Sequence, residues 1–105
     1  MKETVEQLKE LLGADFSELV SAFENDNRMH IDKIKLALAN GDAATVASEA
    51  HSIKGASSNL GAVELAEKCQ LLETAGKNND LPSDDSLVTE IEALFNQAVA
   101  ILHQA

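Results

Sequence analysis

The residues of this sequence best suited to chemistry are His51 and two residues that follow it at helical spacing. Lys54 lies three residues after His51 and Gly55 four residues after it, so the three share one face of a helix. A neutral imidazole ring is a nucleophile that operates near neutral pH. An ammonium group beside it attracts and offsets the negative charge of a group, such as a phosphoryl group, attached to the ring. The spacing therefore places a cation where it would offset the charge of an anionic group on His51.

The other residues expected around His51 are small. At roughly 100° per residue, the apolar residues of this helix face the core, and His51 lies nearly opposite them. Long charged side chains normally fill an exposed helix face, and Gly55 inside a helix costs about 1 kcal/mol relative to alanine. Such a surface lets another macromolecule come close to the imidazole ring. The remaining neighbours expected on this outer face are Ala47, Ser48, Ser58 and Ala62.

The other two histidines are poorer candidates for this role. His30 lies on the apolar stripe of its helix, where a hydrogen-bonded and partly buried imidazole is expected. His103 lies in the last turn of its helix, where a cation complements the helix dipole. Neither is followed by a lysine–glycine pair at the spacing seen after His51. The sequence thus singles out one histidine.

Helices must position these residues, because the composition favours helix throughout. Ala and Leu dominate, both good helix formers, and the chain has one proline, three Phe and neither Trp nor Tyr. A length of 105 residues fits one domain, residues 1–105. We predict an all-α fold, an antiparallel four-helix bundle with an additional short N-terminal helix. The expected helices are Glu3–Leu12, a second from Asp15 to Asn40, Ala43–Leu60, Ala62–Ala75 and Asp84–His103.

A few residues mark the ends of these helices. Asp15, with a glutamate three residues later, predicts a capping box at the start of the second helix. The Asn-Gly pair before Asp42 predicts the end of that helix, and Asp42 itself predicts a cap for the third. The segment from Gly76 to Pro82 predicts the clearest loop. Asn27 interrupts the apolar stripe of the second helix.

Charge and cysteine content argue against several classes of function. The formal net charge of −10 disfavours nucleic acid as a partner, because proteins that bind nucleic acid concentrate Lys and Arg. It also disfavours binding to an anionic membrane surface. Cys69 is the single cysteine, so neither an internal disulfide nor a thiolate metal site is expected, and its apolar surroundings predict a buried thiol. The sequence shows neither a signal peptide nor a membrane span. We expect a cytoplasmic monomer.

The segment from His51 to Ala62 carries a resemblance to a known family. It reads HSIKGASSNLGA and resembles the signature of the histidine-phosphotransfer family of multistep two-component phosphorelays. That signature is a histidine, lysine-glycine at the third and fourth following positions, small residues, and then leucine-glycine-alanine. Every one of these positions matches, and the resemblance extends to helix number, order and approximate length.

The resemblance implies a specific role for each residue of this segment. His51 would be the phosphoacceptor, through Nε2, taking a phosphoryl group from a receiver-domain aspartate and passing it to, or back from, the aspartate of another response regulator. Lys54 would lie near the phosphoryl oxygens, and Gly55 would leave room for the partner. Members of the family often place a polar residue of the next helix near the histidine. By spacing that residue is Glu73, with Gln70 as the alternative.

The family also implies partners and cofactors. The partners would be receiver domains of response regulators or of a hybrid sensor histidine kinase, and the receiver would supply the Mg²⁺, so no cofactor is expected on this chain. The sequence has no Gly-rich phosphate loop. We therefore expect a phosphocarrier without nucleotide-dependent kinase activity of its own.

Three other classes of protein share some of these features. Asp85-Ser86-Leu87 matches the tripeptide of acyl carrier proteins, but only one helix follows it, and Ser83 to Ser86 fits a helix N-terminus. The dimerisation domain of a sensor kinase usually has an acidic residue directly after its histidine, where this chain has Ser52. An interaction module that has lost phosphotransfer stays open, although His51, Lys54 and Gly55 argue against it.

Overall fold

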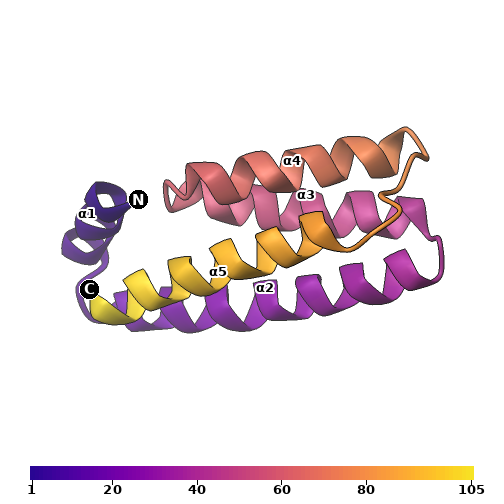
Figure 1. Ribbon diagram of the computed structural model, residues 1–105. Helices are drawn as coiled ribbons and strands as arrows, with labels where there is room; N and C mark the ends of the chain where they lie inside the picture. Colours follow the sequence, from indigo (N-terminus) through magenta and orange to yellow (C-terminus); the bar gives the residue numbers. More distant parts are fainter.

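The computed structural model describes all 105 residues, which form five α-helices and no strand (Figure 1). Four helices lie antiparallel in a bundle, and the short first helix stands across one end of it. The predicted all-α bundle with an additional N-terminal helix is confirmed. The elements are α1 (Lys2–Leu12), a 3-10 turn (Gly13–Asp15), α2 (Phe16–Ala39), α3 (Ala43–Asn59), α4 (Val63–Lys77) and α5 (Ser86–Gln104).

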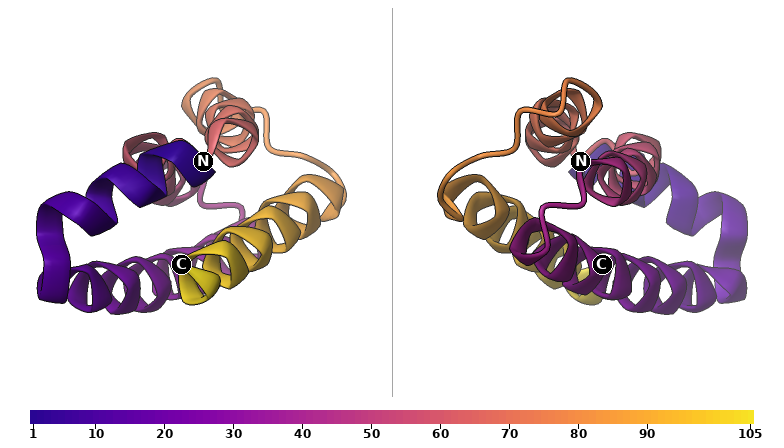
Figure 2. Two further views of the ribbon diagram at one scale, coloured as in Figure 1. Left: turned by 90° about the vertical axis from the view of Figure 1, so that its left-hand side faces the viewer. Right: turned by 90° about the vertical axis from the view of Figure 1, so that its right-hand side faces the viewer.

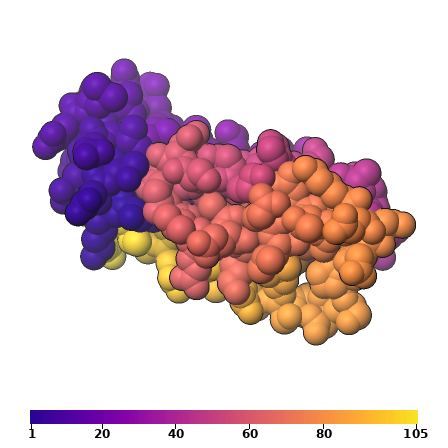
Figure 3. Space-filling view, turned by 90° about the horizontal axis from the view of Figure 1, so that it is seen from above, coloured from indigo at the N-terminus to yellow at the C-terminus, as the bar shows by residue number.

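The bundle is elongated, with principal extents of 42 × 19 × 18 Å. Both termini lie at the end where α1 crosses the bundle, and the α2–α3 turn and the α4–α5 loop lie at the other end (Figures 1 and 2). Seen from above, α4 covers much of the surface and α1 protrudes at one end (Figure 3). Each of the four long helices also has a face that is exposed to solvent.

The core follows the apolar stripes of the sequence. In α5, Phe95 is fully buried, and its ring centroid lies 5.6 Å from that of Phe23 in α2. In α4, Cys69 is buried as predicted. Side chains that recur every three or four residues line one face of each helix and exclude water between the helices. The largest fully buried apolar side chains include Ile31, Ile34, Ile53, Leu65, Leu72, Ile91 and Leu102.

The N-terminal helix is joined to α2 rather than set apart by a capping box. Asp15 has helical backbone angles and its side chain accepts no capping hydrogen bond, because the 3-10 turn carries the chain directly from α1 into α2. The predicted capping box is therefore wrong. At its other end α1 rests on the α3–α4 turn, where a Cβ at Gly61 would lie 2.8 Å from Thr4 Oγ1.

The α2–α3 turn is built as the sequence predicts. Helix α2 ends at Ala39, Gly41 has a φ of +68°, and the Asp42 side chain accepts a hydrogen bond from the backbone N–H of Thr45 at 3.2 Å. Hydrogen bonds from Thr45 lower the pKa of Asp42, because they stabilise its ionised form. This cap fixes where α3 begins.

Helix α4 is longer than predicted, because Gly76 belongs to it and not to the following loop. Gly76 is buried, and a Cβ on it would lie 2.7 Å from the carbonyl oxygen of Ala43 and 2.9 Å from Ala47 Cβ. Only glycine permits so close an approach of the two backbones. This contact brings α4 against α3 near His51.

Candidate functional site

The site is centred on His51, which lies midway along α3 on its outer face. Its side chain is 66% exposed, whereas Val46, Ala50 and Ile53 on the opposite face are fully buried. The prediction that His51 faces solvent is confirmed. The helix therefore presents an imidazole ring at the surface on a rigid, buried scaffold.

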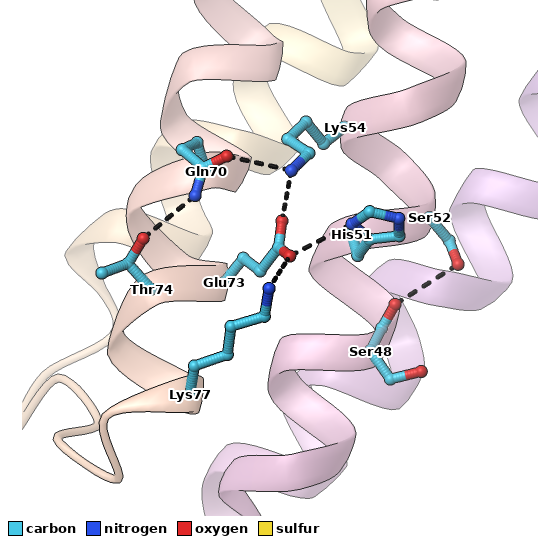
Figure 4. Close-up of polar contacts among 8 residues, drawn as sticks. All are labelled: Ser48, His51, Ser52, Lys54, Gln70, Glu73, Thr74 and Lys77. Atoms are coloured by element: carbon cyan, nitrogen blue, oxygen red, sulfur yellow. Dashed lines mark hydrogen bonds and ion pairs between the residues drawn. The ribbon is translucent and has the colours of Figure 1, made fainter.

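A buried carboxylate lies behind the ring. Glu73 projects from α4 toward α3, and its side chain is only 1% exposed (Figure 4). Oε2 lies 3.1 Å from His51 Nδ1 and 2.9 Å from Lys77 Nζ, and Oε1 lies 2.6 Å from Lys54 Nζ. Three nitrogen donors from two helices thus converge on one carboxylate.

These donors keep Glu73 ionised. Its pKa is lowered from 4.5 to about 2, first by Lys54, then by Lys77 and His51, which together outweigh the opposing effect of burial. Hydrogen bonds and nearby positive charges stabilise the ionised carboxylate. At neutral pH Glu73 is therefore a hydrogen-bond acceptor only.

The ionised carboxylate determines which nitrogen of His51 holds the proton. Because Glu73 accepts only, the neutral ring must donate Nδ1–H to it, and the lone pair then lies on Nε2. Nδ1 is turned toward Glu73, and the exposed ring extends outward from α3 (Figure 4). The arrangement prepares Nε2 as a nucleophile.

A hydrogen-bond chain along α4 holds Lys54 in place. Lys54 Nζ donates to Gln70 Oε1 at 2.9 Å, and Gln70 Nε2 donates to Thr74 Oγ1 at 3.0 Å (Figure 4). The Lys54 side chain is 25% exposed, so its ammonium group is fixed beside the ring and still reaches solvent. Both predicted polar residues of α4 thus take part: Glu73 contacts the ring, and Gln70 orients the lysine.

Comparison with known proteins identifies the family. Residues 18–101 match the Hpt domain. The chain belongs to this family. Its fold is similar to the crystal structure of histidine-containing phosphotransfer protein B (HptB) from Pseudomonas aeruginosa PAO1, with a TM-score of 0.89 and 30% identity over 97% of this chain and 89% of that one. No curated protein matches the chain. The Hpt match supports a histidine-phosphotransfer role in phosphorelays.

Within this Hpt domain the predicted outer face is narrower than the sequence suggests. Ser48, Gly55 and Ser58 are exposed, but Ala47 and Ala62 are only 8% and 9% exposed, which corrects the prediction for both. Ala47 packs under Gly76 of α4, and Ala62 has left α3 for the turn before α4. An ideal helical wheel places both outside, because it ignores the neighbouring helix and the end of its own helix.

Lys77 is a member of the site that the sequence analysis missed. It lies one turn after Glu73 in α4, and this i,i+4 spacing is the signal that was available. The predicted loop hid that signal, since it ended the helix before Lys77. With Lys77 included, two lysines surround one glutamate, so these three side chains carry a net positive charge.

The other histidines of the Hpt domain have different surroundings. His30 is partly buried, with its Nδ1 paired to Glu49 of α3. His103 Nε2 lies 2.8 Å from Glu24. Neither has a lysine in ion-pair contact with its carboxylate partner. The two imidazole–carboxylate pairs therefore lack the cations that surround His51.

The remaining reactive groups are poor candidates for a site. Burial, with a smaller contribution from Glu73, raises the pKa of Cys69 to about 12, so its nucleophilic thiolate form is suppressed. No three His, Cys, Asp or Glu side chains gather in a group able to hold a metal ion. None of the helices has both the length and the apolar character needed to cross a membrane.

Proposed function

We propose that His51 is the phosphoacceptor of a phosphorelay and that residues 1–105 act as one histidine-phosphotransfer domain. The protein takes a phosphoryl group from the aspartate of a receiver domain and passes it to, or back from, the aspartate of another response regulator. The observation that supports this most directly is the hydrogen bond from His51 Nδ1 to the buried Glu73. It leaves Nε2 as the only free ring nitrogen, on a side chain that is 66% exposed.

The transfer step follows from this geometry. The Nε2 lone pair attacks phosphorus as the bond from phosphorus to the aspartate oxygen breaks, and the aspartate leaves as a carboxylate. The Nδ1 proton stays in its hydrogen bond to Glu73, so the ring carries a positive charge that the carboxylate offsets. Onward transfer is the reverse reaction at a second aspartate. Positioning and charge neutralisation dominate such phosphoryl transfers.

Lys54 and Gly55 have separate roles in this proposal. Lys54 is held by Glu73 and Gln70 beside the ring, where its charge offsets that of the phosphoryl oxygens. Gly55, with Ser48 and Ser58 on the same exposed face, leaves room for the receiver domain. Glu73 touches no reacting atom and is a positioning residue, because it orients His51 and fixes the position of its proton.

The proposal assigns Mg²⁺ to the receiver domain. Glu73 is the only carboxylate in contact with the His51 ring, and two ammonium groups already bind it, so these residues do not fit a divalent cation. We also propose that the protein has no nucleotide-dependent kinase activity, that it is a monomer, and that it works with its receiver partners in the cytoplasm. Partners other than receiver domains, such as nucleic acid or membranes, do not fit its net charge of −10.

The test is phosphoryl transfer from phosphorylated receiver domains to the wild-type protein and to two variants, His51→Gln and His103→Gln. We expect acid-labile, base-stable label on the wild type and on His103→Gln, and none on His51→Gln. His103→Gln is the matched control, because it removes an exposed histidine that pairs with a glutamate of another helix, Glu24 of α2. Label that survives in His51→Gln refutes the assignment of the site. An unlabelled wild type across a broad panel of receivers favours the interaction-module alternative.

A further inference from the structure

A cleft between α2 and α3 lies on the flank of α3 opposite Glu73. We call it the α2–α3 cleft and define it by Leu19, Phe23, Asp26, Asn27 and His30 of α2 and Ala56 of α3, which line it. Ser52 lines it as well, directly after His51 in sequence, and leaves α3 on the side away from Glu73 (Figure 4). The cleft is therefore continuous with the face that presents His51.

The cleft contains a buried acceptor without a partner. Asn27 is 2% exposed, and its Nδ2 donates to the carbonyl oxygen of Phe23 at 2.8 Å. Because a carbonyl oxygen only accepts, this bond fixes the orientation of the amide and leaves Oδ1 free. Asn27 Oδ1 is not among the fully buried side-chain atoms that lack a hydrogen-bond partner, so it still reaches solvent, and the cleft that Asn27 lines is the space open to it.

The other polar groups of the cleft also favour a cation. Asp26 is exposed and forms no ion pair within the chain. His30 donates its Nδ1–H to Glu49 when neutral, which leaves Nε2 as an acceptor. No lysine or arginine lines the cleft. A carboxylate and an amide oxygen thus border a space whose other lining residues are apolar, apart from His30, Ser52 and Asn59.

The size and shape of the cleft suit a single long side chain. Its volume is about 250 Å³, below the usual range of a small-molecule pocket. Leu19, Phe23 and Ala56 offer an apolar wall, against which an aliphatic stem packs while its charged head reaches the acceptors. Arginine and lysine are the two side chains that combine such a stem with donors only.

We infer that the α2–α3 cleft binds an arginine or lysine side chain of the partner receiver domain, with the head group on Asp26 and Asn27 Oδ1. This inference rests on the proposed function for the identity of the partner. It gives a role to the polar residue on the apolar stripe of α2, because Asn27 Oδ1 then accepts a hydrogen bond from the bound side chain. One anchored side chain beside His51 fixes the register in which the receiver meets the imidazole.

The first test measures the binding of small amino-acid amides to the cleft, without a receiver domain. Proton–nitrogen NMR spectra of the labelled protein are recorded during titration with Nα-acetyl-arginine amide, and in parallel with Nα-acetyl-norleucine amide, which lacks the charge. We expect saturable shifts at the Asn27 side-chain amide and at Asp26 and Ala56 with the arginine probe only, and loss of most of that affinity in Asp26→Asn. Equal shifts with norleucine amide mean that the cleft takes an apolar side chain. Shifts unchanged in Asp26→Asn mean non-specific attraction to the acidic surface. Either result overturns the inference.

The second test uses transfer to a receiver domain that accepts label from the wild type. Asp26→Asn is expected to raise KM for the receiver about tenfold with little change in kcat, and Asp26→Glu to restore much of the affinity. Asp32→Asn, which removes an exposed charge of α2 outside the cleft, is the matched control. Unchanged KM in Asp26→Asn refutes the inference.

The two proposals fail in distinguishable ways. Phosphoramidate, a small phosphoryl donor, is used to label His51 without any receiver. If it labels wild type and Asp26→Asn equally while KM for the receiver is unchanged by the substitution, only the cleft assignment is wrong. If it does not label His51 at all, the proposed function is wrong, and the NMR titration still decides whether the cleft binds the arginine probe.

Discussion

Gly55 offers the sharpest test of how the surface around His51 is used. It lies in the interior of α3, its φ is negative, and a Cβ built on it meets no atom within 4 Å. Nothing within the protein therefore requires glycine at this position. Gly55→Ala is expected to raise the free energy of unfolding by about 0.5–1 kcal/mol, because alanine loses less backbone entropy on folding. For a domain of this size the melting temperature rises by about 2–8 °C.

The same substitution is expected to slow phosphoryl transfer. If the receiver packs closely over Gly55, an added methyl group costs about 1–3 kcal/mol of overpacking. That cost corresponds to a decrease of about 5- to 150-fold in kcat/KM for the receiver. Labelling by phosphoramidate should change little, because a small donor does not cover Gly55.

Thermal or urea unfolding and transfer to a receiver domain measure the two effects on one variant. A more stable protein that transfers slowly supports the reasoning, since stability and function then change in opposite directions. Undiminished transfer shows that the receiver does not approach over Gly55. A less stable variant shows that the space at Gly55 is not open, and refutes the structural premise.

Four further predictions concern residues behind this surface. Gly76→Ala should destabilise the protein by about 1–3 kcal/mol in urea unfolding, since its Cβ meets backbone and side-chain atoms of α3 at 2.7–2.9 Å. Glu73→Gln should lower stability at neutral pH by about 1–3 kcal/mol. Because the pKa of Glu73 is about 2 in the folded protein and 4.5 as a free group, the difference should be fully present above pH 4.5 and should shrink as the pH falls through 2; a difference independent of pH contradicts this. Lys77→Gln should slow phosphoramidate labelling of His51 severalfold by removing one of the two cations on Glu73, whereas the exposed Lys33→Gln should not. Cys69 should resist a thiol reagent in the native protein and react on unfolding, because it is fully buried; rapid native labelling argues against the packing of α4.

The helical architecture and the residue at the centre of the site follow from local patterns in the amino-acid sequence. Apolar side chains at i, i+3 and i+4 specify which face of a helix is buried, and so they predicted the core and the exposure of His51. The cap at Asp42 was equally local, because its hydrogen bond spans three residues. The motif from His51 to Ala62 carried the family, since its spacing is a property of one helix and the turn that follows it.

The way in which α3 and α4 share one site depends on contacts between residues far apart in the chain. A helical wheel of α3 predicts that Ala47 is exposed to solvent, but the approach of Gly76 from α4 buries it. The sequence named Glu73 as a neighbour of His51, but its ionised state depends on Lys54 and Lys77 reaching it from two helices. Such effects depend on contacts between residues far apart in the sequence, such as those of His51 and Lys54 with Glu73. The burial and the charge of Glu73 in these contacts set the chemistry of His51.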